Sequence, residues 1–148
     1  MSAKSPHGFL GMDAEGRTAI IRTTGNPDGH IVLRGGKNGP NFNQGAINQA
    51  QDQLRNAGIN PQLVVDCSHG NSNKEHQNQS CALKDVVQQR INGNKNIAGC
   101  MLESHLNPGN QSVNGDLSRL KYGVSITDAC IGWDETEELL TWVYENAS

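Results

Sequence analysis

The sequence is poor in aromatic residues, has no cluster of positive charge and contains no long apolar run. Phe, Trp and Tyr make up 4% of the 148 residues, and the 12 Lys and Arg are scattered along a chain of net charge −3. Without a basic cluster, a nucleic-acid-binding surface is not expected. No stretch approaches the roughly 18–20 apolar residues that span a bilayer, and the first residues lack an apolar signal-peptide core. We therefore expect no binding to nucleic acid or membranes.

The cysteines also lack the spacing of a metal motif or a disulfide framework. No Cys-x-x-Cys pair occurs among Cys67, Cys81, Cys100 and Cys130. This distribution is typical of reduced thiols in a cytoplasmic protein. The length suits one ordinary domain.

Short apolar runs alternate with segments of helical period. The runs predict strands over residues 30–34, 62–68 and 97–104 and, more weakly, over 7–13; residues 18–24 fit either a further strand or a hairpin arm. Uninterrupted apolarity is typical of parallel strands covered on both faces. The periodic segments predict helices over 43–58, 80–93 and 134–148. Such alternation indicates an α/β fold with a parallel sheet or barrel.

The ends of the predicted helices carry recognisable signals. Gly58 and Gly93 stand where carboxyl-terminal caps belong, and Asp134 with Glu137 resembles a capping box. We expect the last helix to bury one apolar face, formed by Leu139, Leu140, Val143 and Tyr144.

Reactive side chains follow the apolar runs. Arg34 follows the first run, Asp66 and His69 end the second, Glu103 follows the third, and Asp128 follows the segment VSIT. In a β/α barrel the carboxyl ends of the strands build the active site. One imidazole and two carboxylates suit Mn²⁺, Fe²⁺, Co²⁺ or Zn²⁺. Separations of 34 residues (69 to 103) and 25 residues (103 to 128) are too long for a local chelate, so this metal site requires adjacent strands.

Each of these residues also has an ordinary interpretation. His69 fits a hydrogen-bonded surface histidine, and Glu103 and Asp128 fit helix caps or solvated loop residues. Arg34 precedes a Gly-Gly pair, so it could bind phosphate together with exposed backbone amides, or form a salt bridge with a neighbour. Cys67 could pair with His69 on a metal, but a small apolar filler of the barrel interior suits it better.

Four segments carry a resemblance to a known family: HIVLRGGK, DCSHGNSNK, ESHLNPGNQS and YGVSITDACIGWDET. They closely resemble the class I phospho-2-dehydro-3-deoxyheptonate aldolases, also called DAHP synthases, and the similarity covers essentially the whole chain. The resemblance implies a transferase that condenses phosphoenolpyruvate with erythrose 4-phosphate on a divalent metal. That reaction opens the shikimate pathway to chorismate and the aromatic amino acids.

The resemblance also assigns roles to individual residues. The family's histidine, glutamate and aspartate metal ligands match His69, Glu103 and Asp128, and the arginine that helps bind the phosphate of phosphoenolpyruvate matches Arg34. His69 would also lie beside the reacting centre, as a catalytic residue that assists proton transfer. The metal would be Mn, Fe, Co or Zn.

Several family motifs have no counterpart here. The family's cysteine metal ligand and a basic sugar-phosphate segment belong to the first half of its barrel. The resemblance thus predicts that residues 1–148 form a single domain, a partial TIM-type barrel of roughly strands 5–8 with their helices. Two open strand edges would then favour a homo-oligomer or pairing with the missing amino-terminal half. The alternative is an inactive fragment, a remnant that binds metal or phosphate.

Overall fold

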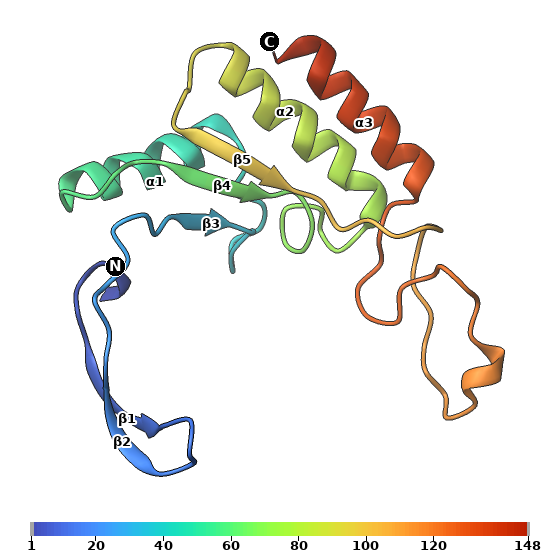
Figure 1. Cartoon of the computed structure of the whole chain (residues 1–148). Helices are drawn as coiled ribbons and strands as arrows, with labels where there is room; N and C mark the ends of the chain where they lie inside the picture. The colour runs from blue at the N-terminus through green and yellow to red at the C-terminus, as the bar shows by residue number, and fades with distance from the viewer. Residues whose placement is uncertain (1, 148) are drawn as a thin grey trace. The chain divides into compact units, whose positions relative to one another are not determined.

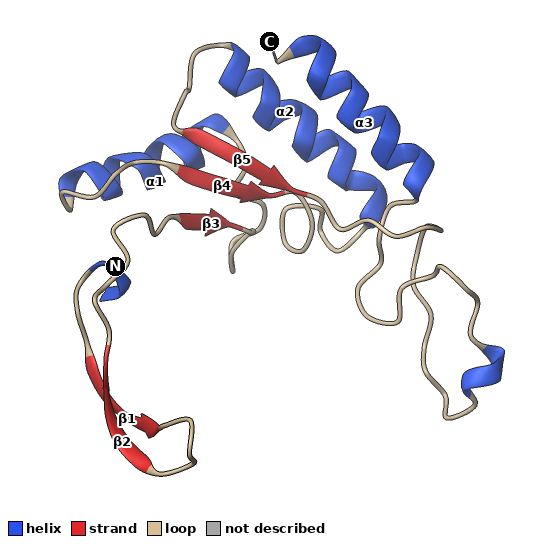
Figure 2. Cartoon of the chain, in the orientation of Figure 1, coloured by secondary structure: helices blue, strands red, loops and turns tan. Residues whose placement is uncertain are grey.

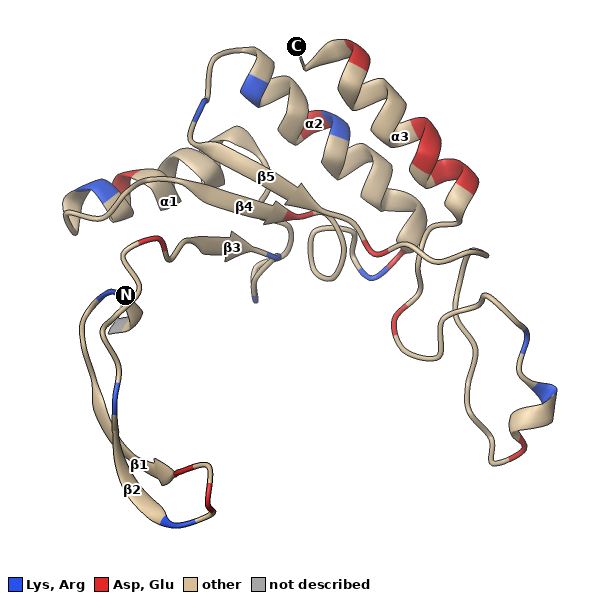
Figure 3. Ribbon diagram, viewed as in Figure 1, with Lys and Arg blue, Asp and Glu red and all other residues tan. Residues whose placement is uncertain are grey.

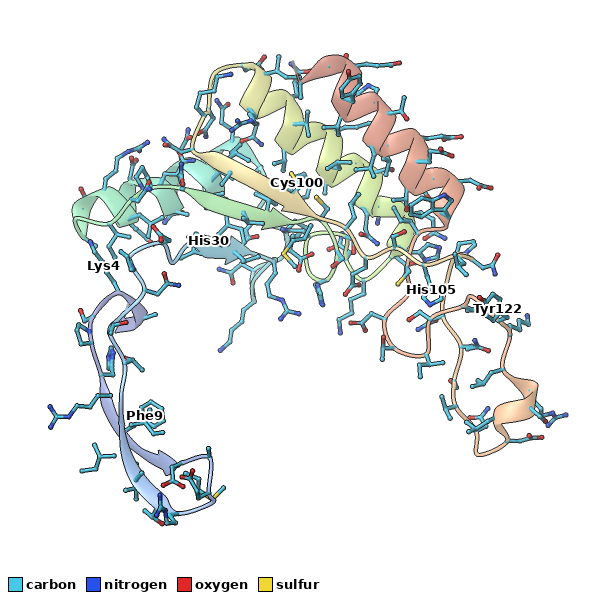
Figure 4. All side chains as sticks on the ribbon, in the orientation of Figure 1. Lys4, Phe9, His30, Cys100, His105 and Tyr122 are labelled. Carbon is cyan, nitrogen blue, oxygen red and sulfur yellow. The ribbon has the colours of Figure 1, made fainter. Side chains whose placement is uncertain are left out.

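The computed structural model describes residues 2–147, which divide between residues 30 and 31 into two compact units. The first unit is an antiparallel hairpin of β1 (Gly8–Met12) and β2 (Thr18–Arg22), preceded by a short 3-10 helix, η1 (Ser2–Lys4). The strand predicted over 7–13 is confirmed, and residues 18–24 supply the hairpin arm. Large apolar side chains of the hairpin remain exposed, Phe9 (Figure 4) by 53% and Ile20 by 73%.

The turn of this hairpin is held by one carboxylate. Asp13 Oδ1 accepts hydrogen bonds from the backbone N–H groups of Glu15 at 3.0 Å and Arg17 at 2.9 Å. The hydrogen bond from the Arg17 backbone is the main cause that lowers the pKa of Asp13.

The second unit is built on a parallel sheet in the order β3-β4-β5 (Figure 1). The strands are β3 (Ile31–Leu33), β4 (Leu63–Asp66) and β5 (Ile97–Met101). Helix α1 (Gln44–Asn56) connects the first two, and α2 (Gln79–Ile91), preceded by the 3-10 turn η2 (His76–Asn78), connects the last two. After β5 a long loop with the 3-10 turn η3 (Leu117–Arg119) leads to α3 (Trp133–Asn146), which packs beside α2 (Figure 2). The predicted parallel strand–helix alternation is confirmed. None of the described helices is both long and apolar enough to cross a bilayer.

The carboxyl-terminal ends of α1 and α2 agree with the sequence prediction, whereas the amino-terminal end of α3 does not. Gly58 and Gly93 adopt the positive φ angles of 66° and 111° that glycine tolerates at a helix end. The capping box at Asp134 was a wrong prediction: α3 begins at Trp133, and among the described residues no side chain caps it. Asp134 lies inside the first turn, where its charge favours the positive end of the helix dipole.

The buried face of α3 also differs from the prediction. Thr136 and Leu139 are buried, whereas Leu140 is 53% and Tyr144 is 82% exposed. The apolar cluster on α2 receives Leu139 together with partly buried Trp142 and Val143. The face of α3 that packs against α2 therefore contains Trp142 in place of the expected Leu140 and Tyr144.

The helices cover one face of the sheet. Leu63, Val65 and Cys67 alternate along β4 and its end, are 0% exposed, and pack against side chains of the helices. This position corrects the placement of Cys67 in the barrel interior, since its thiol lies between sheet and helices. On the opposite face, Val32 is 42% and Met101 is 47% exposed. Among the described residues, this second face has no helical cover.

Candidate active site

An open pocket of about 900 Å³ lies where the three parallel strands end. Charged residues of both signs gather there (Figure 3). Its lining includes Arg34 after β3, His69 and Lys74 after β4, Glu103 after β5 and Asp128 before α3. Polar side chains that the sequence scatters over nearly a hundred residues thus share one cavity.

Three of these side chains converge as a metal site requires. His69 Nε2 lies 3.4 Å from Glu103 Oε1 and 3.6 Å from Asp128 Oδ2, and the three potential ligand atoms lie within 4.8 Å of one another. Metal–ligand bonds of about 2.1 Å separate neighbouring ligand atoms by roughly 3.0–3.4 Å in octahedral or tetrahedral geometry. One imidazole nitrogen with two carboxylate oxygens at this spacing fits a divalent transition-metal cation. The adjacent strands β4 and β5 bring His69 and Glu103 together, and the loop before α3 brings Asp128 to them.

The turn after β4 holds His69 from two sides. Its backbone adopts a positive φ of 48°, a region that side-chain-bearing residues occupy at a cost of about 1–2 kcal/mol. Its Nδ1 lies 2.8 Å from Asp66 Oδ2 and 2.7 Å from Ser68 Oγ. Asp66 and Ser68 are 3% and 2% exposed, so the imidazole is anchored on buried polar groups. The other ring nitrogen, Nε2, is left to face the two acids.

Glu103 is positioned through its backbone by a buried amide. Gln79, the first residue of α2 and 0% exposed, accepts from Glu103 N–H at 2.8 Å and donates to the Glu103 carbonyl at 3.1 Å. The same carbonyl accepts from Ile131 N–H at 3.0 Å. These bonds fix the point where the Glu103 side chain leaves the chain. The nearby His105 (Figure 4) accepts from Leu106 N–H and lies outside the three-residue group.

Asp128 stands on a less constrained segment. Paired backbone bonds between Gly109 and Cys130, at 2.9 and 3.2 Å, hold its loop beside the segment that follows β5. The Asp128 side chain itself is 71% exposed, against 31% for Glu103 and 27% for His69. Burial raises the pKa of the neighbouring Cys130 thiol, which keeps that sulfur protonated.

Arg34, Gly35 and Gly36 line the pocket, but the backbone N–H groups of the two glycines already have partners within the loop. Gly35 N–H donates to Asn41 Oδ1 at 2.7 Å and Gly36 N–H donates to the Gly39 carbonyl at 2.9 Å. The amides are therefore engaged within the loop, which corrects the expectation that they are free to bind phosphate. Among the described residues, neither Arg34 nor Lys74 forms an ion pair, so the salt-bridge alternative for Arg34 is not observed either.

The loops after β3 and β4 touch through glycine. A Cβ on Gly35, whose φ is 83°, would lie 2.5 Å from the carbonyl carbon of Gly70. The buried Asn71 side chain adds bonds to the Leu33 carbonyl at 3.0 Å and to Asn41 N–H at 2.7 Å. These contacts fix the stem of Arg34 relative to that of His69.

Two thiols lie behind the site, on the side of the sheet that faces the helices. The neighbouring side chain of Cys100 (Figure 4), followed by burial, raises the pKa of Cys67, whose Sγ–H donates to the Val65 carbonyl at 4.0 Å. The interaction with the Cys67 side chain lowers the pKa of Cys100. All four cysteines are free, and Cys67 does not belong to the group that could hold a metal. The apolar-filler interpretation of Cys67 agrees with this burial.

Comparison with known proteins identifies the family. The DAHP synthetase I family model matches residues 1–141. The Tyr-sensitive phospho-2-dehydro-3-deoxyheptonate aldolase of Escherichia coli is 46% identical over 145 residues, which are 98% of this chain and 40% of that protein. The phenylalanine-inhibited enzyme of Saccharomyces cerevisiae is 42% identical over an alignment 150 residues long, which covers 97% of this chain and 40% of that protein. The solved structure of phospho-2-dehydro-3-deoxyheptonate aldolase from Francisella tularensis SCHU S4 matches with a TM-score of 0.92 and 42% identity, over 99% of this chain and 42% of that chain.

The chain therefore belongs to the DAHP synthetase I family, as its motifs predicted. It spans about two-fifths of the length of these relatives.

Two residues of the site were not predicted from the sequence. Lys74 closes the DCSHGNSNK motif and could have been found by its charge, whereas Gln79 lies in an amide-rich stretch that carries no distinguishing signal.

Proposed function

We propose that this chain supplies the metal-binding and part of the phosphate-binding side of a DAHP synthase active site. The observation that carries the proposal is the convergence of His69, Glu103 and Asp128 within 4.8 Å at the ends of the parallel strands. Family membership supports phosphoenolpyruvate and erythrose 4-phosphate as the substrates. Within residues 2–147, the outer edges of β3 and β5 are unpaired and one face of the sheet has no helical cover. Both features support a partial TIM-type barrel of residues 1–148, in which a second half or a second copy completes the wall. The free thiols suit a cytoplasmic protein.

Each residue has a task in this reaction. His69 Nε2 and the carboxylates of Glu103 and Asp128 would hold Mn, Fe, Co or Zn, which when bound acts as a Lewis acid toward a carbonyl oxygen. Arg34 would bind the phosphate of phosphoenolpyruvate through its guanidinium, and Lys74 adds a second cation in the same pocket. Since Asp66 holds Nδ1 of His69 and Nε2 faces the position proposed for the metal, our proposal gives His69 the ligand role rather than proton transfer.

The metal site is tested by titrating the chain with Mn²⁺ and measuring affinity by calorimetry or by the loss of the free-ion electron paramagnetic resonance signal. We expect His69→Gln and Glu103→Gln each to weaken binding at least about tenfold, or ~1.4 kcal/mol. Glu138→Gln, on the exposed side of α3, is the control and should bind as the wild type does. Equal affinities for all four proteins would refute the site.

The reaction is tested by complementation. The chain is mixed with the amino-terminal part of the E. coli relative that has no counterpart here, and loss of phosphoenolpyruvate is followed with erythrose 4-phosphate and Mn²⁺. Activity in the mixture alone supports a shared active site, and activity of the chain alone would show that the second half is dispensable. Should neither be active while the intact E. coli enzyme is, the inactive metal- or phosphate-binding remnant is favoured.

A further inference from the structure

Asp66 is a buried acid whose only basic partner among the described residues is the imidazole of His69. It ends β4, is 3% exposed, and among the described residues contacts no Lys or Arg. Aspartate is rarely this buried unless its oxygens are fully hydrogen-bonded. Here they are: Oδ1 accepts from Ser68 N–H at 2.9 Å and from Ser68 Oγ–H at 2.6 Å, and Oδ2 lies 2.8 Å from His69 Nδ1. Oδ1 therefore stabilises the turn, and Oδ2 contacts the imidazole.

This arrangement determines which nitrogen of His69 carries the proton. The Ser68 hydroxyl directs its hydrogen toward Asp66 Oδ1, so toward His69 Nδ1, 2.7 Å away, it presents a lone pair. Asp66 Oδ2 is also an acceptor. The two acceptors lie within 2.8 Å of Nδ1, whereas the carboxylates lie 3.4 and 3.6 Å from Nε2, so the hydrogen belongs on Nδ1 and a neutral imidazole then has its lone pair on Nε2. That lone pair points toward Glu103 and Asp128, where a cation would lie.

We propose that Asp66, assisted by Ser68, is a positioning residue that selects the Nδ1–H tautomer of His69 and so presents Nε2 to the metal. The proposal rests on the proposed function for the metal itself, and it adds a group that touches neither metal nor substrate. Partners of this kind typically change metal affinity 10–100-fold.

The variant Asp66→Asn distinguishes a role in selecting the His69 tautomer from a role in stabilising the turn alone. The asparagine Oδ1 can still accept from Ser68 and preserve the turn, while its amide NH₂ replaces Oδ2 and donates toward His69 Nδ1. A donor at that position favours the opposite tautomer, with hydrogen on Nε2, which blocks the metal-facing lone pair. The control is Asp52→Asn, an exposed acid paired with Arg55 at the helix surface.

Two measurements test the proposal on the full chain. Long-range ¹H–¹⁵N correlation spectra of the metal-free protein, at a pH where free imidazole is neutral, distinguish the tautomers of its five histidines. His69→Gln identifies the His69 signals. We expect Nδ1–H in the wild type and in Asp52→Asn, and Nε2–H in Asp66→Asn. In parallel, Mn²⁺ affinity should fall 10–100-fold in Asp66→Asn and stay unchanged in Asp52→Asn.

The outcomes separate the two proposals. An Nε2–H tautomer in the wild type would overturn the role of Asp66, even if Asp66→Asn fails to fold. A folded Asp66→Asn with wild-type tautomer and affinity would overturn it as well. If the wild type binds Mn²⁺ no better than His69→Gln, the proposed metal site fails, whereas the tautomer measurement still decides the role of Asp66.

Discussion

The side-chain amide of Gln79 fixes the backbone of Glu103, and this role leads to a prediction about the stability of the protein. It is fully buried and bonds both backbone groups of Glu103, so Gln79→Leu removes two hydrogen bonds with little change in side-chain volume. The Glu103 carbonyl keeps its bond from Ile131 N–H, but the Glu103 N–H loses its only hydrogen bond among the described residues. The substitution therefore leaves one orphaned donor at the end of β5.

The expected loss follows from these contacts. A neutral hydrogen bond contributes about 0.5–1.5 kcal/mol, and an unsatisfied donor away from water costs about 1–3 kcal/mol. Because Glu103 is partly exposed, we expect Gln79→Leu to lower the free energy of unfolding by roughly 2–3 kcal/mol. With a urea dependence of about 2 kcal/mol per molar, the unfolding midpoint should fall by about 1–1.5 M.

A matched control lies on the same helix. Gln88 is exposed and bonds only the Asn92 side chain, so Gln88→Leu should change the free energy of unfolding by less than about 0.5 kcal/mol. Urea unfolding followed by circular dichroism compares the two, and Mn²⁺ affinity should fall for Gln79→Leu alone. If Gln79→Leu and Gln88→Leu unfold at the same urea concentration, the buried hydrogen bonds between Gln79 and Glu103 do not stabilise the protein as proposed.

Two further predictions concern the loop contact and the thiols. Gly35→Ala places a Cβ 2.5 Å from the carbonyl carbon of Gly70 at a φ of 83°, so the unfolding temperature of this variant should fall by an amount equivalent to about 2 kcal/mol or more. The control Gly36→Ala has open space around the new Cβ and should be nearly neutral. Equal unfolding temperatures for the two variants would contradict the contact between the loops. A raised pKa means less thiolate at a given pH, so iodoacetamide at pH near 7.5 should label exposed Cys81 first and buried Cys67 only after unfolding, as read by mass spectrometry. Equally rapid labelling of both thiols in the native protein would contradict the burial of Cys67.

The sheet could be predicted because its pattern is local. Each apolar run that became a parallel strand is short and continuous, and each helix that follows shows its own period. The carboxyl ends of parallel strands meet at one edge, so the approach of His69 to Glu103 follows from topology alone. The family motifs named the same residues, and the geometry brings them together.

The supporting contacts could not be predicted, because they join residues that are distant in sequence through groups that have no pattern. Gln79 binds the backbone of a residue 24 positions away, and a backbone N–H is the same in every residue. The face on which Cys67 packs depends on which side of β4 receives helices. The start of α3 depends on Gly132, whose extended backbone ends the preceding loop two residues before the capping signal at Asp134.

The anchoring of the ligands is unequal, and this inequality has a thermodynamic consequence. His69 is held by buried Asp66 and Glu103 by buried Gln79, and both anchors belong to the β4–α2 segment. Asp128 is 71% exposed and stands on a loop. A cation would thus meet two ligands whose geometry folding has already fixed, and would have to order the third itself. Ordering a side chain of this kind costs about 0.5–1.5 kcal/mol on binding, so in the proposed site the Asp128 loop, rather than the strand ends, would limit the affinity for a metal.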